Sequence, residues 1–166
     1  MHQSIAELEK LLAEQKSLYC ELYRLEEEKT GAIISKNGSL IQELCVAQES
    51  LLDRVESAEA ARLALISHIS GSLGELEASC TISRIAEYAG ESGSRRLMAT
   101  GAEFKSVILR LKERQETNSR LLKDNLEFFS IFIAGLKNSS SLKGGYDRDG
   151  KENVRVVNPV LFNTKA

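Results

Sequence analysis

The residues that could carry out chemistry are few, and none stands in a known catalytic motif. His2 lies at the N-terminus, and His68 lies among Ile66, Ser67 and Ile69 late in an expected helix. The chain has no H-E-x-x-H motif, no P-loop and no Rossmann glycine pattern. A catalytic site needs a nucleophile or a base that a second group holds in place. We therefore expect no enzyme activity, and we expect His68 to be a histidine at a helix end or an interface.

The cysteines and the acidic residues predict no metal site. Cys20, Cys45 and Cys80 form no C-x-x-C pair, and their odd number and scattered positions favour reduced thiols that fill small apolar spaces on helices. The sequence YDRDGKEN, residues 146–153, begins like a calcium loop. It lacks the third early acid and the glutamate at the twelfth position of such a loop. We expect neither a bound metal nor a cofactor.

Charge and hydropathy exclude two further classes of protein. The net charge is -2, which argues against a nucleic-acid binder with a strong basic face. The N-terminus has no signal-peptide pattern, and the longest apolar run, Leu126 to Leu136, has 11 residues where a bilayer span needs about 20. We expect a cytoplasmic protein without membrane insertion.

Charged clusters are expected to lie on solvated helix faces. The acids Glu26, Glu27 and Glu28 predict a solvated helix end, with a docking patch as the alternative. The basic residues of segments 95–96 and 110–114 stand in an expected helix that is also rich in acids, so they too predict a solvated face.

Composition and periodicity predict an all-α protein. The chain has one proline and no tryptophan, and apolar residues recur at alternating spacings of three and four. These spacings predict a helix over residues 4–34, a turn at Asn37 and Gly38, and a second helix over 40–69 with Ser39 as its N-cap in a capping box with Gln42. The expected stripe of the second helix is Leu40, Leu44, Ala47, Leu51, Val55, Ala58, Leu65 and Ile69. The pair, residues 4–69, should form a long antiparallel hairpin.

The second half of the chain predicts a short helix, a long helix and a tail. Glycines punctuate residues 71–93, and a short helix is expected at 81–89. A long C-terminal helix is expected over 94–137, with glutamine and asparagine at several positions of its apolar stripe. Residues 1–137 should form one helical domain, and residues 138–166 a mobile, flexible tail.

Three sequence segments resemble the FlgN family of flagellar type III export chaperones. They are the hairpin LLAEQKSLYCELYRLEEEKTGAIISKNGSLIQELCVAQESLLDRV, the last-helix segment LKERQETNSRLLKDNLEFFSIF and the tail segment GGYDRDGK, and the resemblance extends from about residue 11 to residue 151. It implies a small, helical, non-enzymatic, cytosolic chaperone. Such proteins hold hook-associated proteins 1 and 3 by their C-terminal segments before export, and then dock at the flagellar export apparatus.

The resemblance also implies that the C-terminal helical region binds the client. The expected client-binding residues are Asn118, Leu121, Leu122, Asn125, Phe128, Phe129, Phe132, Ile133 and Leu136. A helix that is apolar on every side needs a cover on every side, and a client segment could supply it. Two other interpretations stay open: this helix end is buried in a monomeric bundle or a homodimer, and the protein is a structural coiled-coil subunit or spacer of a larger assembly.

Overall fold

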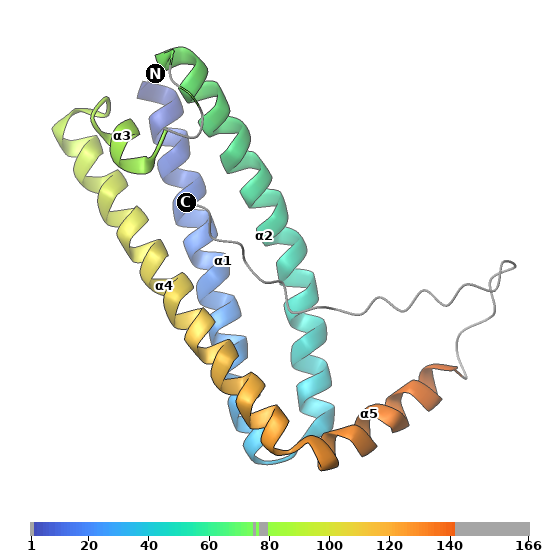
Figure 1. The fold of residues 1–166 in the computed structure, drawn as a ribbon. Helices are drawn as coiled ribbons and strands as arrows, with labels where there is room; N and C mark the ends of the chain where they lie inside the picture. Colours follow the sequence, from blue (N-terminus) through green and yellow to red (C-terminus); the bar gives the residue numbers. More distant parts are fainter. Residues whose placement is uncertain (1, 75, 77–79, 142–166) are drawn as a thin grey trace, which may run out of the picture. The chain divides into compact units, whose positions relative to one another are not determined.

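The computed structural model describes residues 2–74, 76 and 80–141, and these residues confirm the all-α class. The helices are α1 (His2–Ile34), α2 (Gly38–Leu73), α3 (Ile82–Ala86), α4 (Gly90–Asp124) and α5 (Leu126–Ser141), as Figure 1 shows. The chain divides into two units, Met1–Leu126 and Glu127–Ala166. The first unit contains α1 to α4 and is described first. The tail was expected over residues 138–166. Residues 138–141 instead belong to α5, and residues 142–166 lie outside the described residues.

The antiparallel α1–α2 hairpin turns at a cap that differs from the expected one. The Asn37 side-chain oxygen accepts a hydrogen bond from the Leu40 backbone N–H at 3.1 Å, so Asn37 is the N-cap of α2. The preceding Lys36 takes a positive φ of 53°. Ser39, the expected N-cap, lies inside the first turn of α2. The expected cap was wrong because Asn37, two residues before Ser39, accepts a hydrogen bond from a free backbone N–H of the first turn, and α2 therefore begins at Gly38.

Helix α4 runs parallel to α1 in a nearly fixed register. Lys16 pairs with Glu103 at 2.7 Å, and Arg96 donates to Glu9 at 2.9 Å; both pairs are 87 residues apart in sequence. In a parallel pair of helices, the difference in residue number between contacting residues stays constant along the pair, whereas in an antiparallel pair it changes. Helix α1 packs along both α2 and α4 and is therefore the central element of this unit.

Two apolar clusters form the core of the first unit, and Phe104 contacts both. One cluster lies around the α3 end and is built from Ile5, Leu8, Leu12, Ile66, Ile69, Cys80, Ile85, Ala86 and Leu97. The other contains Leu18, Tyr19, Leu22, Leu51, Val55, Ala58 and Leu111. The Phe104 ring meets the Tyr19 ring edge-on, with 5.1 Å between centroids. Burial of these apolar side chains is the main favourable contribution to the stability of the bundle.

Several expected helix boundaries are corrected by the structure. Helix α2 continues to Leu73 and ends at Gly74, which has a φ of 67° in the left-handed region that glycine tolerates. The short helix is α3, capped by the Thr81 side chain, and it ends at Ala86. The helix expected over 94–137 is two helices, because α4 begins at Gly90 and ends at Asp124 and α5 follows after Asn125.

The expected core positions need smaller corrections. In the α2 stripe, Leu40 and Ala47 are exposed, while Gln48 and Ile66 are buried. Cys80 is buried as expected of an apolar filler, although it lies before α3 and not on a helix. Cys20 and Cys45 are exposed, so the filler prediction was wrong for both. His68 is exposed near the end of α2, in agreement with a helix-end histidine.

Gln15 places a polar layer between the two apolar clusters. Its amide nitrogen donates to the Glu59 carboxylate at 2.6 Å, and Arg62 donates to the same carboxylate. The hydrogen bonds from Arg62 and Gln15 lower the pKa of Glu59 against the opposing effect of its burial. Among the described residues, the Gln15 side-chain oxygen is the buried polar atom without a hydrogen-bond partner. Such an atom destabilises a fold, since it has lost its water.

We expect Gln15→Leu to increase the free energy of unfolding by about 1 kcal/mol, because it removes the unsatisfied oxygen and fills the space with apolar atoms. Glu59 keeps the hydrogen bonds from Arg62 in this variant. Urea unfolding at pH 7 measures the change. The matched control is Gln42→Leu at an exposed position of α2, which should change stability by less than about 0.5 kcal/mol. Destabilisation by Gln15→Leu would show that the Glu59 contact outweighs the unsatisfied oxygen.

Candidate functional site

A buried carboxylate joins three helices near the end of the unit where α1 turns into α2. Glu26 of α1 is 4% exposed. One carboxylate oxygen accepts hydrogen bonds from Lys29 at 2.7 Å and from the Gln48 amide at 2.8 Å. Lys29 also donates to the Gln48 side-chain oxygen at 2.6 Å. The positive charge of Lys29 and the amide of α2 therefore replace the water that Glu26 loses on folding.

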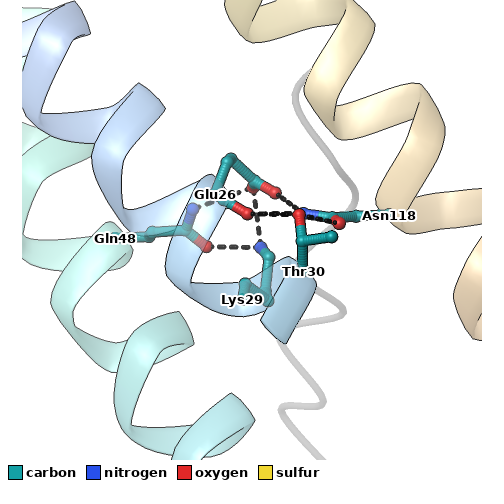
Figure 2. Close-up of polar contacts among 5 residues, drawn as sticks. All are labelled: Glu26, Lys29, Thr30, Gln48 and Asn118. Carbon is teal, nitrogen blue, oxygen red and sulfur yellow. Dashed lines mark hydrogen bonds and ion pairs between the residues drawn. The ribbon is translucent and has the colours of Figure 1, made fainter. Parts of the chain in front are cut away.

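Asn118 of α4 supplies the third partner, as Figure 2 shows. Its amide nitrogen donates to the second carboxylate oxygen of Glu26 at 2.6 Å and to the Glu26 backbone carbonyl at 2.9 Å. Its side-chain oxygen lies 2.7 Å from the Thr30 hydroxyl, which can donate to it. Asn118 is 2% exposed, so its hydrogen-bonding groups are all used inside the bundle. We call Glu26, Lys29, Thr30, Gln48 and Asn118 the polar network.

The polar network corrects the expectation that Glu26 belongs to a solvated helix end. Only Glu27 and Glu28 of that acidic run are exposed. The signal that could have found Glu26 was present in the sequence. The apolar stripe of α1 passes through Tyr19 and Leu22, and the next step of four reaches Glu26. An acid at a buried stripe position needs a buried donor, and Asn118 occupies the matching position of the α4 stripe.

The basic residues of α4 are placed by contacts with α1. The Arg110 guanidinium lies over the Tyr23 ring, 4.5 Å from its centroid, and Arg114 lies 3.6 Å from the Glu27 carboxylate. These contacts are at the surface, where each contributes modestly to stability. They follow the same parallel register as the polar network and so support the position of α4 along α1.

The remaining expected site residues lie from the end of α4 into α5. Leu121 and Leu122 are half-buried on the last turn of α4. Asn125 follows as the C-cap, and its side-chain nitrogen donates to the Leu121 carbonyl at 2.9 Å. We call residues 121–136 the C-terminal apolar segment. Both asparagines of the expected site thus use their amides within the chain.

Helix α5 carries apolar side chains that are open to solvent. Phe128 is 38% exposed, Ile133 51% and Ile131 72%. The Phe128 and Phe129 rings meet edge-on, with 5.1 Å between their centroids. The half-buried Phe132 and Leu136 lie on the same side of the helix as the buried Phe129, at the three- and four-residue spacings of a helical stripe. Ile131 was not among the expected site residues, although it is more exposed than Phe128 and Ile133.

Membrane spans and metal-ligand clusters are both absent from the described residues. In that part of the chain, no helix combines the length and apolar character needed to cross a membrane. Within the same residues, no three histidine, cysteine or acidic side chains are grouped so that they could hold a metal ion.

We expect Asn118→Ala to lower the free energy of unfolding by about 2–4 kcal/mol, because the Glu26 carboxylate would lose its donor from α4 while staying buried. Chemical denaturation at neutral pH measures this loss. Ser119→Ala, at an exposed position of the same turn, is the matched control and should have almost no effect. An equal, small effect of the two substitutions would show that the polar network adds nothing to stability.

Comparison with known proteins identifies one matching family model. A protein family described as "FlgN protein" matches residues 1–153, which is most of the chain. No curated protein and no solved structure matches. Members of the matched family are non-enzymatic chaperones of flagellar export that bind hook-associated proteins. The chain belongs to the FlgN family.

Proposed function

We propose that this protein is a cytoplasmic chaperone that binds the C-terminal segments of hook-associated proteins 1 and 3. In this proposal it prevents their premature assembly and delivers them to the flagellar type III export apparatus. The observation that carries the proposal is the family match over residues 1–153, together with the exposed apolar side chains of α5. A chaperone of this kind needs an apolar surface that a client can cover, and α5 carries one.

The chemistry of α5 suits a helical client segment. Helices recognise one another when apolar side chains spaced by three and four residues lie in the groove of the partner. Phe129, Phe132 and Leu136 have this spacing, and Phe128 and Ile133 flank them on either side. A client helix with its own apolar stripe would bury this face. Aromatic side chains are strong contributors at such interfaces because they bury a large area with few rotatable bonds.

The two asparagines receive a different role in this proposal. The amides of Asn118 and Asn125 are bound within the chain, so we assign them to positioning and not to client contact. The residues proposed for client contact are Leu121, Leu122, Phe128, Phe129, Phe132, Ile133 and Leu136. The polar network holds α4 against α1 at Asn118, shortly before the C-terminal apolar segment begins.

We expect Phe129→Ala combined with Phe132→Ala to weaken binding of a client C-terminal peptide by about tenfold or more, because interface aromatics often contribute about 2 kcal/mol or more. Isothermal titration calorimetry with that peptide measures the affinity. Far-ultraviolet circular dichroism should show largely unchanged helicity, with a moderate fall in melting temperature because Phe129 is 5% exposed. Ile131→Ala is the matched control, since Ile131 is exposed on a different face of α5 and should affect affinity little.

The alternative outcomes of this experiment are distinct. A large fall in melting temperature would show that the two phenylalanines stabilise the fold, since truncation of a buried aromatic typically costs about 3–5 kcal/mol. Size-exclusion chromatography with light scattering tests the remaining interpretations. A stable homodimer that binds no client peptide, and that dissociates when residues 126–166 are deleted, would favour a structural assembly protein over a chaperone.

A further inference from the structure

We propose that Asn125 is a switchable hinge: its side-chain amide keeps α4 and α5 as separate helices, and a client helix selects the alternative state in which they are continuous. The second half of this inference rests on the proposed function, and the first half does not. It is carried by one hydrogen bond and by the sequence pattern on both sides of it.

The hydrogen bonds at Asn125 show how the break is held. In an uninterrupted helix, the N–H of residue 125 would donate to the carbonyl of Leu121, four positions earlier. Here the Asn125 backbone N–H donates to the Leu122 carbonyl at 3.2 Å, and the side-chain amide donates to the Leu121 carbonyl at 2.9 Å. The side chain has taken the acceptor that the backbone would otherwise use. Both carbonyls are satisfied, so the break leaves neither of them unpaired.

The sequence around Asn125 does not require a break. Residues 111–134 contain neither proline nor glycine, the residues that most often interrupt helices. The positions of the stripe also continue through the break with regular spacing, at 111, 115, 118, 122, 125, 129, 132 and 136, of which Gln115, Asn118 and Asn125 are polar and the other five apolar. This alternation of four and three is the pattern of one amphipathic helix. The separation of α4 from α5 therefore depends on the Asn125 side chain.

Formation of the continuous helix would align two parts of the C-terminal apolar segment. Leu122 would then lie on the same stripe as Phe129 and Phe132, which gives a partner helix a longer apolar face. A ligand shifts a two-state equilibrium only when it binds one state more tightly. The longer face supplies that difference, so client binding should favour the continuous state, and removal of the Asn125 amide should favour it without a client.

The test measures the distance between spin labels on α4 and α5. Lys112→Cys and Ser130→Cys place labels at exposed positions 18 residues apart, which is five turns of a continuous helix. The native cysteines are replaced by alanine. A continuous helix separates the two backbone positions by about 27 Å on one face. We expect Asn125→Leu and Asn125→Ala to move the distance distribution towards a narrow peak of this separation, compared with the parent chain.

Thr117→Val is the matched control for this substitution. The Thr117 hydroxyl donates to the Glu113 carbonyl at 2.9 Å, also four residues earlier, but within an unbroken part of α4. Its removal should leave the label distances unchanged. The hinge is overturned if both Asn125 variants keep the distance distribution of the parent chain.

A second measurement adds a peptide with the C-terminal segment of hook-associated protein 1. The peptide should move the parent chain towards the same narrow distribution, and it should bind Asn125→Leu about three- to tenfold more tightly, since that variant no longer has to leave the broken state. If the peptide binds the parent chain and the distance between the labels does not change, the proposal that the client favours the continuous helix is wrong. If no variant binds the peptide while Asn125→Leu still changes the distance, the proposed function fails and the hinge stands.

Discussion

The buried carboxylate of Glu26 is the interaction on which the arrangement of the helices depends. A charged oxygen inside a bundle is tolerated only when donors replace its water, and here α1, α2 and α4 each provide one. Helices that pack only through apolar stripes can shift by one turn relative to each other with a small change in free energy, because similar apolar side chains then replace one another in the contacts. A shift of this kind would separate the Glu26 carboxylate from its donors on α2 and α4, so the polar network disfavours it. The polar network thus provides specificity of register where the apolar clusters provide most of the stability.

This register links the bundle to the C-terminal helix. Helix α4 lies parallel to α1, and the network holds it at Asn118, less than two turns before its end. The residues beyond that point are the ones that we assign to client contact. In the proposed function, the α1–α4 unit provides the stable fold and the exposed side chains of α5 provide the surface that a client covers.

Much of the fold could be predicted from the sequence, because apolar residues at three- and four-residue spacings predict long helices. The α1–α2 hairpin follows from this periodicity and from the turn at Asn37. The same periodicity misled at residue 125, where the stripe continues but the helix does not, since one side-chain amide competes with the backbone. Glu26 was assigned to a solvated end because three acids in a row favour solvent. The periodicity of α1 places Glu26 on the apolar stripe, but it does not identify the donor, Asn118, which is 92 residues away.

The candidate site was predictable in part for the same reason. The apolar character of α5 is visible in the sequence, and the structure shows Phe128 and Ile133 exposed. That these residues bind a client stays a prediction. The roles of the asparagines were not visible. An asparagine on an apolar stripe can face a partner, a neighbouring helix or its own backbone, and only the structure distinguishes these. Asn118 faces a neighbouring helix and Asn125 its own backbone.

The parallel pairing of α1 with α4 has a consequence for the order in which the chain folds. Glu26 and Gln48 are 22 residues apart, so the hairpin can close while the rest of the chain is still being synthesised. Asn118 is 92 residues from Glu26 and leaves the ribosome much later. Until α4 is synthesised, the partners of the Glu26 carboxylate are therefore Lys29, Gln48 and water. Docking of α4 is then the step that completes the core, and the C-terminal helix emerges only after the bundle that carries it has every element it needs.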